Sequence, residues 1–142
     1  MIKVKTKEDA AVKTGSPIGA VGRRKSAIAR VWLRKGTGGI AINNLRCAEY
    51  FKTDETRTTV IKSLLLCDAI KNYDVVVNVH GGGLCAQADA IKLGIARALV
   101  KDNEAFRSVL RDHGALTVDD RNKERKKPGQ SGARRKFQFV KR

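Results

Sequence analysis

The chain has 142 residues, of which 30 are Lys or Arg and 14 are Asp or Glu, so its formal net charge is +16 at pH 7. That length fits one ordinary domain, and that charge favours a polyanionic partner, either nucleic acid or an anionic membrane. No apolar run approaches the roughly 18 residues of a membrane-spanning helix, and the basic segments lack the apolar face of a membrane-surface helix, so nucleic acid is preferred.

The first half of the chain predicts strands followed by a helix. Residues 1–18 show no sustained period and are interpreted as a flexible lead-in. Residues 21–35 alternate in polarity and predict one long strand. Its apolar face would carry Ala27, Ala29, Val31 and Leu33, and its other face Arg24, Arg30, Trp32 and Arg34.

The glycines of residues 35–39 predict a turn into a second strand at residues 40–42, so that the two strands would form a hairpin. Asn43 and Asn44 would end this second strand. A helix is expected to follow a cap at Thr53 or Asp54. Its apolar stripe would contain Val60, Ile61, Leu64 and Leu65.

Residues 73–79 give the strongest strand signal in the chain. Val75 and Val77 share one face and Val76 lies on the other, so both faces are expected to be partly covered. Three glycines then break the strand, and a helix is expected over residues 84–100. Its apolar stripe would contain Leu84, Ala88, Ile91, Ile95 and Leu99. A second stripe, Ala86, Ala90 and Gly94, would leave room for a backbone or for RNA to approach closely, and a short further helix at residues 104–111 would end at Gly114.

The glycine turn at Gly81, Gly82 and Gly83 has two interpretations. Backbone N–H groups at the start of a helix suit an anionic oxygen, such as an RNA phosphate. A tight strand-to-helix turn that requires positive φ is the structural alternative. A nucleotide-dependent enzyme built on residues 81–86 is a third hypothesis, although no Gly-Lys-Ser/Thr motif and no following strand support it.

The chain offers little for catalysis or for metal binding. Its three cysteines (Cys47, Cys67 and Cys85) are widely spaced, and its two histidines (His80 and His113) lie far apart in sequence. No acid–base pair, triad or cluster of metal ligands can be assembled from them. We therefore expect no enzyme, no cofactor and no metal.

The last 22 residues, 121–142, contain ten Lys or Arg residues and a single acid, Glu124, so they supply +9 of the net charge. They have almost no apolar surface to offset the roughly 1–2 kcal/mol per residue of backbone entropy that folding costs. The segment is either a solubilising or targeting tail, or an arm that becomes ordered against a polyanion.

Four stretches carry a family resemblance: residues 22–31, residues 36–44 followed by Tyr50-Phe51, residues 79–99, and residues 124–127 together with the end of the chain from Ala133. They resemble the ninth protein of the small ribosomal subunit in its bacterial or organellar form. The tail departs from the family pattern at Pro128, at residues 130–132, at Lys136-Phe137 and at Val140.

The resemblance implies an α+β two-layer sandwich, in which a four-stranded sheet packs against helices and contains a left-handed βαβ unit (ribosomal protein S5 domain 2-like). Sequence reasoning alone would have chosen the right-handed crossover. The implied division is a lead-in at residues 1–18, a globular RNA-binding domain at residues 19–115 and an extended basic tail at residues 116–142.

The implied function is that of a structural constituent of the small ribosomal subunit, in the cytoplasm or in the plastid stroma if the chain is organelle-encoded. Its partners would be small-subunit rRNA in the head, neighbouring head proteins, and the anticodon stem-loop of peptidyl-site tRNA. Lys141 and Arg142 would contact the tRNA. The residues that would bind rRNA are Arg23, Arg24, Lys25, Arg30, Gly81, Gly82, Gly83, Arg97, Arg125, Lys126, Lys127, Arg134, Arg135 and Lys136. On charge alone, a free RNA chaperone or an architectural DNA-binding protein remains the alternative.

Overall fold

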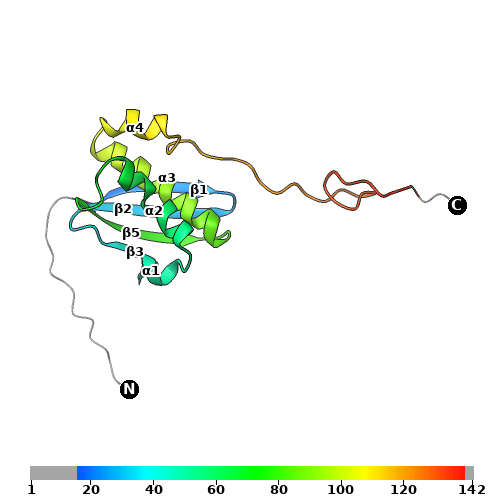
Figure 1. Ribbon diagram of the computed structural model, residues 1–142, viewed down its shortest axis with the longest axis horizontal. Coiled ribbons are helices and arrows are strands. Elements are labelled where there is room, and N and C mark those ends of the chain that lie inside the picture. The colour runs from blue at the N-terminus through cyan, green and yellow to red at the C-terminus, as the bar shows by residue number, and fades with distance from the viewer. Residues whose placement is uncertain (1–15, 140–142) are drawn as a thin grey trace, which may run out of the picture.

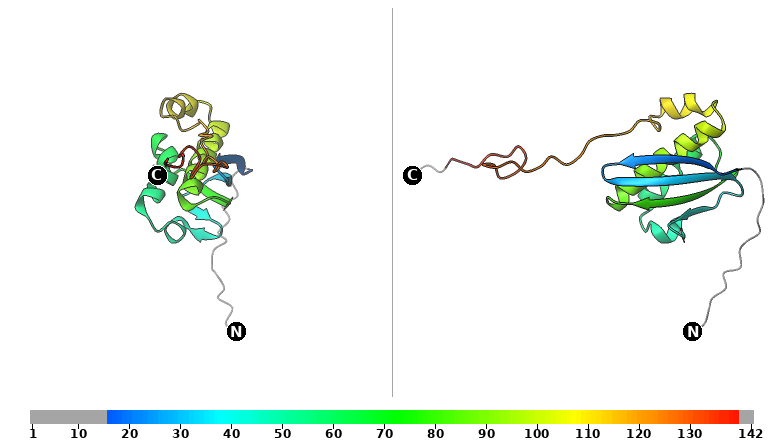
Figure 2. Two further views of the ribbon diagram at one scale, coloured as in Figure 1. Left: turned by 90° about the vertical axis from the view of Figure 1, so that its right-hand side faces the viewer. Right: turned by 180° about the vertical axis from the view of Figure 1, so that it is seen from behind.

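The computed structural model describes residues 16–139. Along the chain it contains β1 (Ile18–Arg24), β2 (Ala27–Lys35), β3 (Ile40–Ile42), β4 (Leu45–Arg46), α1 (Cys47–Tyr50), α2 (Asp54–Leu66), β5 (Tyr73–His80), α3 (Leu84–Asp102) and α4 (Phe106–Asp112). The strands form one open sheet in the order β1-β2-β5-β3-β4. The helices lie together on one face of this sheet (Figures 1 and 2), so the fold is a mixed α+β sandwich of two layers. The sheet has five strands rather than the expected four, because the two-residue β4 adds an edge.

The long strand predicted for residues 21–35 is wrong, because this stretch is a hairpin of two strands. β1 and β2 pair antiparallel from Ile18↔Leu33 to Arg24↔Ala27. Lys25 adopts φ 53° at the tight turn between them. The buried positions change from even-numbered residues in β1 to odd-numbered residues in β2. The exposed Val21 hides this change in the sequence, because it is apolar and has the phase of Ala27.

The predicted hairpin between residues 21–35 and 40–42 is also wrong. β5 lies between β2 and β3, antiparallel to β2 and parallel to β3. The parallel pair β3 and β5 is connected through α1 and α2. Asn43 and Asn44, with φ 47° and 66°, end β3 as expected and turn the chain into β4.

Asp74 of β5 explains why the glycine-rich loop leads away from β2 rather than back onto it. Its Oδ1 accepts three backbone N–H bonds, from Thr37 (2.9 Å), Gly38 (2.9 Å) and Gly39 (2.8 Å). These bonds hold the pKa of the Asp74 carboxyl below its ordinary value. A single carboxylate thus fixes the loop that delivers β3 to the far side of β5.

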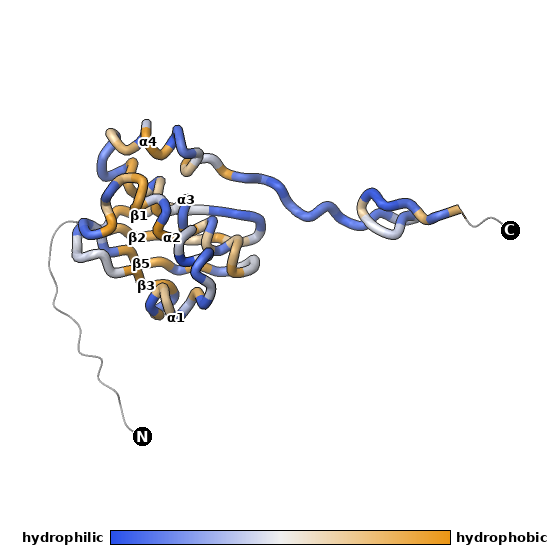
Figure 3. Tube along the Cα trace, viewed as in Figure 1, coloured by the Kyte–Doolittle hydropathy of each residue, from blue (hydrophilic) through white to orange (hydrophobic). Residues whose placement is uncertain are grey.

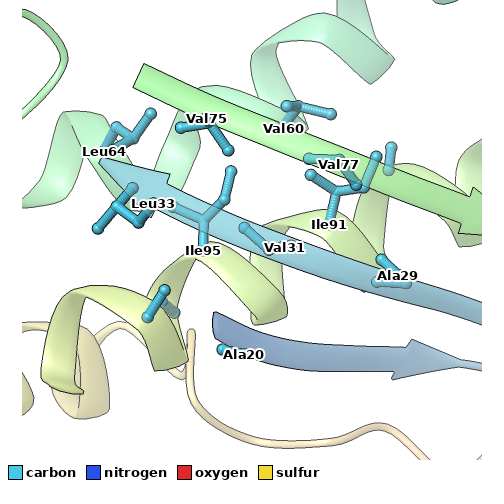
Figure 4. Packing of buried hydrophobic residues seen from close by; sticks show 14 of the residues in the cluster. Ala20, Ala29, Val31, Leu33, Val60, Leu64, Val75, Val77, Ile91 and Ile95 are labelled. Atoms are coloured by element: carbon cyan, nitrogen blue, oxygen red, sulfur yellow. The ribbon is translucent and has the colours of Figure 1, made fainter. Parts of the chain in front are cut away.

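The core lies between the helices and the inward face of the sheet (Figure 4). The central strands bury the faces that their alternation predicts, and α3 buries Ile91, Ile95 and Leu99. Each fully buried side chain of this kind contributes about 1.5–3 kcal/mol relative to an exposed one. Leu84, expected in the same stripe, is instead 52% exposed as the first residue of α3.

The stripe of small residues on α3 serves close packing against β1. A Cβ on Gly22 would stand 1.9 Å from the carbonyl oxygen of Ala90 and 2.6 Å from the backbone nitrogen of Gly94. A Cβ on Gly94 would stand 2.5 Å from Cγ2 of Val31. The expected close approach is therefore made by backbone of the same chain.

After α4 the chain leaves the domain. Gly114 (φ 63°) closes α4 as expected, and its N–H donates to Arg111 O. Ala115 is buried, whereas residues 120–129 are all exposed. The following segment extends far from the sandwich and folds into one small loop (Figure 1), and it is hydrophilic along most of its length (Figure 3). The predictions for residues 1–15 and for Lys141 and Arg142 fall outside the described residues.

Candidate nucleic-acid interface

The face of the sheet opposite the helices is uncovered within residues 16–139 (Figure 2). Both faces of β5 were expected to be partly covered, and on this face the cover from the described residues comes only from neighbouring side chains of the sheet, which leave Val76 42% exposed. Arg30 and Arg34 are exposed on β2, with the half-buried Trp32 between them. Trp32 lies opposite Val76, and Arg30 lies opposite Val21, which is itself 40% exposed. This face therefore presents guanidinium groups around an indole and two valines.

The three basic residues at the first hairpin have different environments. Arg23 and Lys25 are exposed. Arg24 is half-buried and engaged: its Nη1 lies 2.7 Å from Oδ1 of Asp119 and donates to Asp119 O at 2.8 Å, and its Nε lies 3.7 Å from Oδ2 of Asp89. Arg24 therefore links the hairpin to the root of the tail, while its two neighbours are free to meet a ligand.

Asp119 is held by cations from two directions. Arg121 donates to its carboxylate through Nε (3.0 and 3.1 Å) and Nη2 (2.6 Å). These bonds, together with the charge of Arg24, hold the pKa of the Asp119 carboxyl far below its ordinary value. The tail is thus attached to the domain at the point where it begins to extend.

Arg97 and Lys101 on α3 bind the outer edge of β1. Arg97 Nη1 donates to Val21 O at 2.8 Å, and Lys101 Nζ donates to Gly19 O at 2.7 Å. They satisfy carbonyl groups of an edge strand that would otherwise be open to pairing with another chain. Arg97 therefore has a structural partner within the chain in addition to its predicted role toward rRNA.

At the glycine turn, Gly81 and Gly82 have φ values of 75° and 63°. A Cβ on Gly81 would stand 2.4 Å from Ser26 O, in the turn between β1 and β2. Gln87 reinforces the turn, because its Nε2 donates to Gly81 O at 3.0 Å and its Oε1 accepts from the Tyr50 hydroxyl at 2.8 Å. Gly83, the N-cap of α3, has open space where its Cβ would be. Gly81 and Gly82 therefore have the positive φ that a tight strand-to-helix turn requires. Of the three glycines, only Gly83 has no neighbouring atom close to the position of a Cβ.

The basic residues of the tail lie in a segment that is largely open to solvent. They comprise Arg125, Lys126, Lys127, Arg134, Arg135 and Lys136. Among them Arg134 is paired with Glu124 across the small loop, at 2.6 Å. Sequence reasoning missed the organising role of two acids, Asp119 and Glu124. The available signal was their position in the sequence, because Asp119 immediately precedes the strongly basic segment with Asp120, and Glu124 is the single acid within residues 121–142.

The described residues hold no group of three or more potential metal ligands. The three thiols are free, and burial raises the pKa of Cys47 and Cys67. Among the helices of residues 16–139, none is long and apolar enough to cross a membrane.

Comparison with known proteins identifies the family. The family model for ribosomal protein S9/S16 matches residues 22–142. Small ribosomal subunit protein uS9 of Cytophaga hutchinsonii is 50% identical over 125 residues, which cover 88% of this chain and 98% of the relative. The uS9 proteins of Methylacidiphilum infernorum and Phocaeicola vulgatus are 47% identical over 131 residues (92% of this chain, 96% of the relative) and 48% identical over 125 residues (88% and 98%). The chain therefore belongs to the ribosomal protein S9/S16 family, whose members are structural, non-enzymatic constituents of the small ribosomal subunit.

Proposed function

We propose that this chain binds small-subunit rRNA in the head of the subunit, and that the end of its tail contacts the anticodon stem-loop of peptidyl-site tRNA. The observation that carries the proposal is the extended tail, a run of exposed cations that leaves a self-contained domain (Figure 1). Such a segment has no core of its own, and phosphate groups are the partners that its charge selects. Cytoplasmic ribosomes are the expected location.

The globular domain would supply a second rRNA contact. Arg30 on the open sheet face, and Arg23 and Lys25 at the first hairpin, have no acidic partner among residues 16–139. Planar Arg and Trp groups suit stacking on unpaired bases as well as contact with the backbone. Gly83, Arg97 and the tail cations from Arg125 to Lys136 complete the proposed rRNA surface, with Arg24 holding the tail in position.

We further propose the family's finer fold, the ribosomal protein S5 domain 2-like arrangement with a left-handed βαβ unit, for residues 19–115. The parallel pair β3 and β5, with both connecting helices on one side of the sheet, supports this proposal. Residues 116–142 would then be the tail and residues 1–18 the lead-in.

Two deletions test the division of the tail. Removing Val140 to Arg142 should leave assembly intact and weaken tRNA binding at the peptidyl site. Removing Arg121 to Arg142 should also lower rRNA affinity. It should reduce the salt slope, which is the slope of the logarithm of the binding constant against the logarithm of salt concentration, by about 0.7–0.9 for each phosphate that the tail no longer neutralises. Unchanged tRNA affinity in the short deletion would count against the role of the tip. Absence of the chain from ribosomes washed in high salt, or an affinity indifferent to rRNA sequence and structure, would favour a free RNA chaperone instead.

A further inference from the structure

We propose that residues 124–135 form a preformed RNA-binding loop, closed by the Glu124–Arg134 ion pair, whose hollow takes one nucleotide. The inference rests on the proposed binding of rRNA by the tail. It goes beyond attraction by net charge, because it names a defined binding site and an ion pair, here called the clasp, that keeps the site closed. The loop is the compact turn in the middle of the otherwise extended tail (Figure 1).

The clasp is a two-pronged ion pair. Arg134 Nε donates to both carboxylate oxygens of Glu124 at 3.1 and 3.0 Å, and Arg134 Nη2 donates to Oε1 at 2.6 Å. This fork-shaped geometry fixes orientation as well as distance. The hydrogen bonds from Arg134 lower the pKa of the Glu124 carboxyl from its ordinary value of 4.5.

A second set of bonds folds the far side of the loop. Arg135 O accepts hydrogen bonds from Ser131 N (2.9 Å), Ser131 Oγ (3.1 Å) and Gly132 N (3.3 Å). Gly129, with φ 72°, follows Pro128 and reverses the chain. Two of the departures from the family pattern, Pro128 and residues 130–132, therefore lie in this turn.

Glu124 is unusual for its charge. It is the only acid among residues 121–139, and in that range six cations (Lys123, Arg125, Lys126, Lys127, Arg135 and Lys136) have no acidic partner. An acid in a segment that binds phosphate lowers affinity unless it has another role. Here its carboxylate offsets the mutual repulsion that would otherwise keep the loop open.

The closed loop borders an open hollow of about 530 Å³, lined by Glu124, Arg125, Lys127, Gln130, Ala133 and Arg134. Hollows of this size fall within the ~300–1,000 Å³ typical of small-ligand sites. The Oε1 atom of Gln130 is buried and has no hydrogen-bond partner among the described residues. A buried acceptor without a donor is costly. Because Gln130 lines the hollow, a rotation of its side chain toward the hollow would bring Oε1 to a donor on a bound ligand.

RNA supplies the matching groups. A 2′-hydroxyl or an exocyclic amine provides a donor for Gln130, and the adjoining phosphate provides an anion for Arg125 and Lys127. One nucleotide turned out of a single-stranded segment offers both at once. The hollow is too polar and too strongly cationic for an apolar side chain of a neighbouring protein.

The decisive test compares Glu124→Gln with the wild-type full chain, using filter binding to a transcript of the head domain of small-subunit rRNA. The substitution raises net charge from +16 to +17, so charge alone predicts tighter binding. The clasp predicts weaker binding, by about tenfold if the open form comes to outnumber the closed one by about ten. The swap Glu124→Arg with Arg134→Glu keeps the net charge at +16, and should restore most of the affinity. Equal or tighter binding by Glu124→Gln, or a swap no better than that variant, would overturn the clasp.

Two further variants test the hollow. Gln130→Ala should weaken binding several-fold without changing the salt slope, because it removes a neutral hydrogen-bonding group. Lys127→Ala should reduce the slope by about 0.7–0.9, because it removes one cation from the phosphate site. Wild-type affinity in Gln130→Ala would refute the nucleotide site. If the wild-type chain and the chain lacking residues 121–142 bound this RNA equally, the proposed function of the tail would fail. Failure of the clasp alone would look different, because the tail would still contribute to affinity while Glu124→Gln bound as tightly as the wild type.

Discussion

Gly22 is the point of closest approach between β1 and α3, and replacing it with alanine should separate the two elements. The new Cβ would stand 1.9 Å from Ala90 O, where ordinary contacts are 3.4–4 Å, so the backbones must move apart by about 1.5 Å. Overpacking of this kind costs about 1–3 kcal/mol, and the upper end applies because the obstacle is backbone rather than a flexible side chain. Alanine recovers about 0.5–1 kcal/mol through lower entropy of the unfolded chain. The expected net destabilisation is about 2 kcal/mol.

The assay is urea unfolding of the RNA-free chain, followed by circular dichroism. A destabilisation of about 2 kcal/mol corresponds to a melting temperature lower by about 8–16 °C for a domain of this size. Gly19→Ala is the matched control on the same strand: its Cβ would face the open side of the sheet, with its nearest neighbouring atom 3.8 Å away on Trp32. It should be neutral or slightly stabilising. If the two variants had the same free energy of unfolding, close packing would not be the role of the α3 stripe.

Two further predictions concern ionisable groups of β5. Asp74→Asn should destabilise the domain by about 1 kcal/mol at pH 7, because three hydrogen bonds lose their charge assistance. The pKa of Asp74 is lowered by folding, so its contribution is present above the ordinary value of 3.8 and disappears as the pH falls through the folded value. Urea titrations should therefore converge for wild type and variant as the pH falls below 3.8, and a constant difference would contradict the assignment. The Tyr73 hydroxyl donates to Asp102, and burial, this bond and the carboxylate raise its pKa to about 12. The contribution of this bond to stability is present below about pH 10 and should disappear between about pH 10 and 12. The Tyr73→Phe variant should therefore show a smaller fall in stability over that range than the wild type. An ultraviolet titration midpoint of Tyr73 near the ordinary value of 10.0 in the folded wild type would refute the shift.

Local periodicity predicted most element types, and it failed wherever pairing depended on distant residues. The alternation from Val21 to Lys35 placed Val31 and Leu33 correctly in the core. It did not show the turn at Lys25, because the apolar Val21 has the same phase in the sequence as Ala27, although Val21 is exposed and the buried face of β1 holds Ala20 instead. Likewise, nothing near residues 36–39 showed that their loop binds a carboxylate some 35 residues further along, at Asp74.

In the candidate site, too, local features could be predicted from the sequence and contacts between distant residues could not. Exposure of the tail cations followed directly from composition, since the segment has no apolar surface to bury. The engagement of Arg24 with Asp119, 95 residues away, did not follow, because the two are brought together only by the packing of the tail root on the first hairpin. The Glu124–Arg134 pair spans ten residues within an irregular segment, so neither helical nor strand spacing predicted it.

The clasp also bears on how far the end of the tail extends from its attachment. Fully extended, the 22 residues after Asp120 would reach about 70–80 Å. Closing residues 124–135 removes about twelve of them from that length, which leaves about ten residues, or about 35 Å of chain, plus the width of the closed loop. Because Arg24 fixes the starting point at Asp119, closure of the loop would limit the reach of the chain beyond it and therefore the distance of the proposed tRNA contact. An opened clasp would thus disturb both proposed contacts, rRNA at the loop and tRNA at the tip, whereas deletion of the tip would disturb only the second.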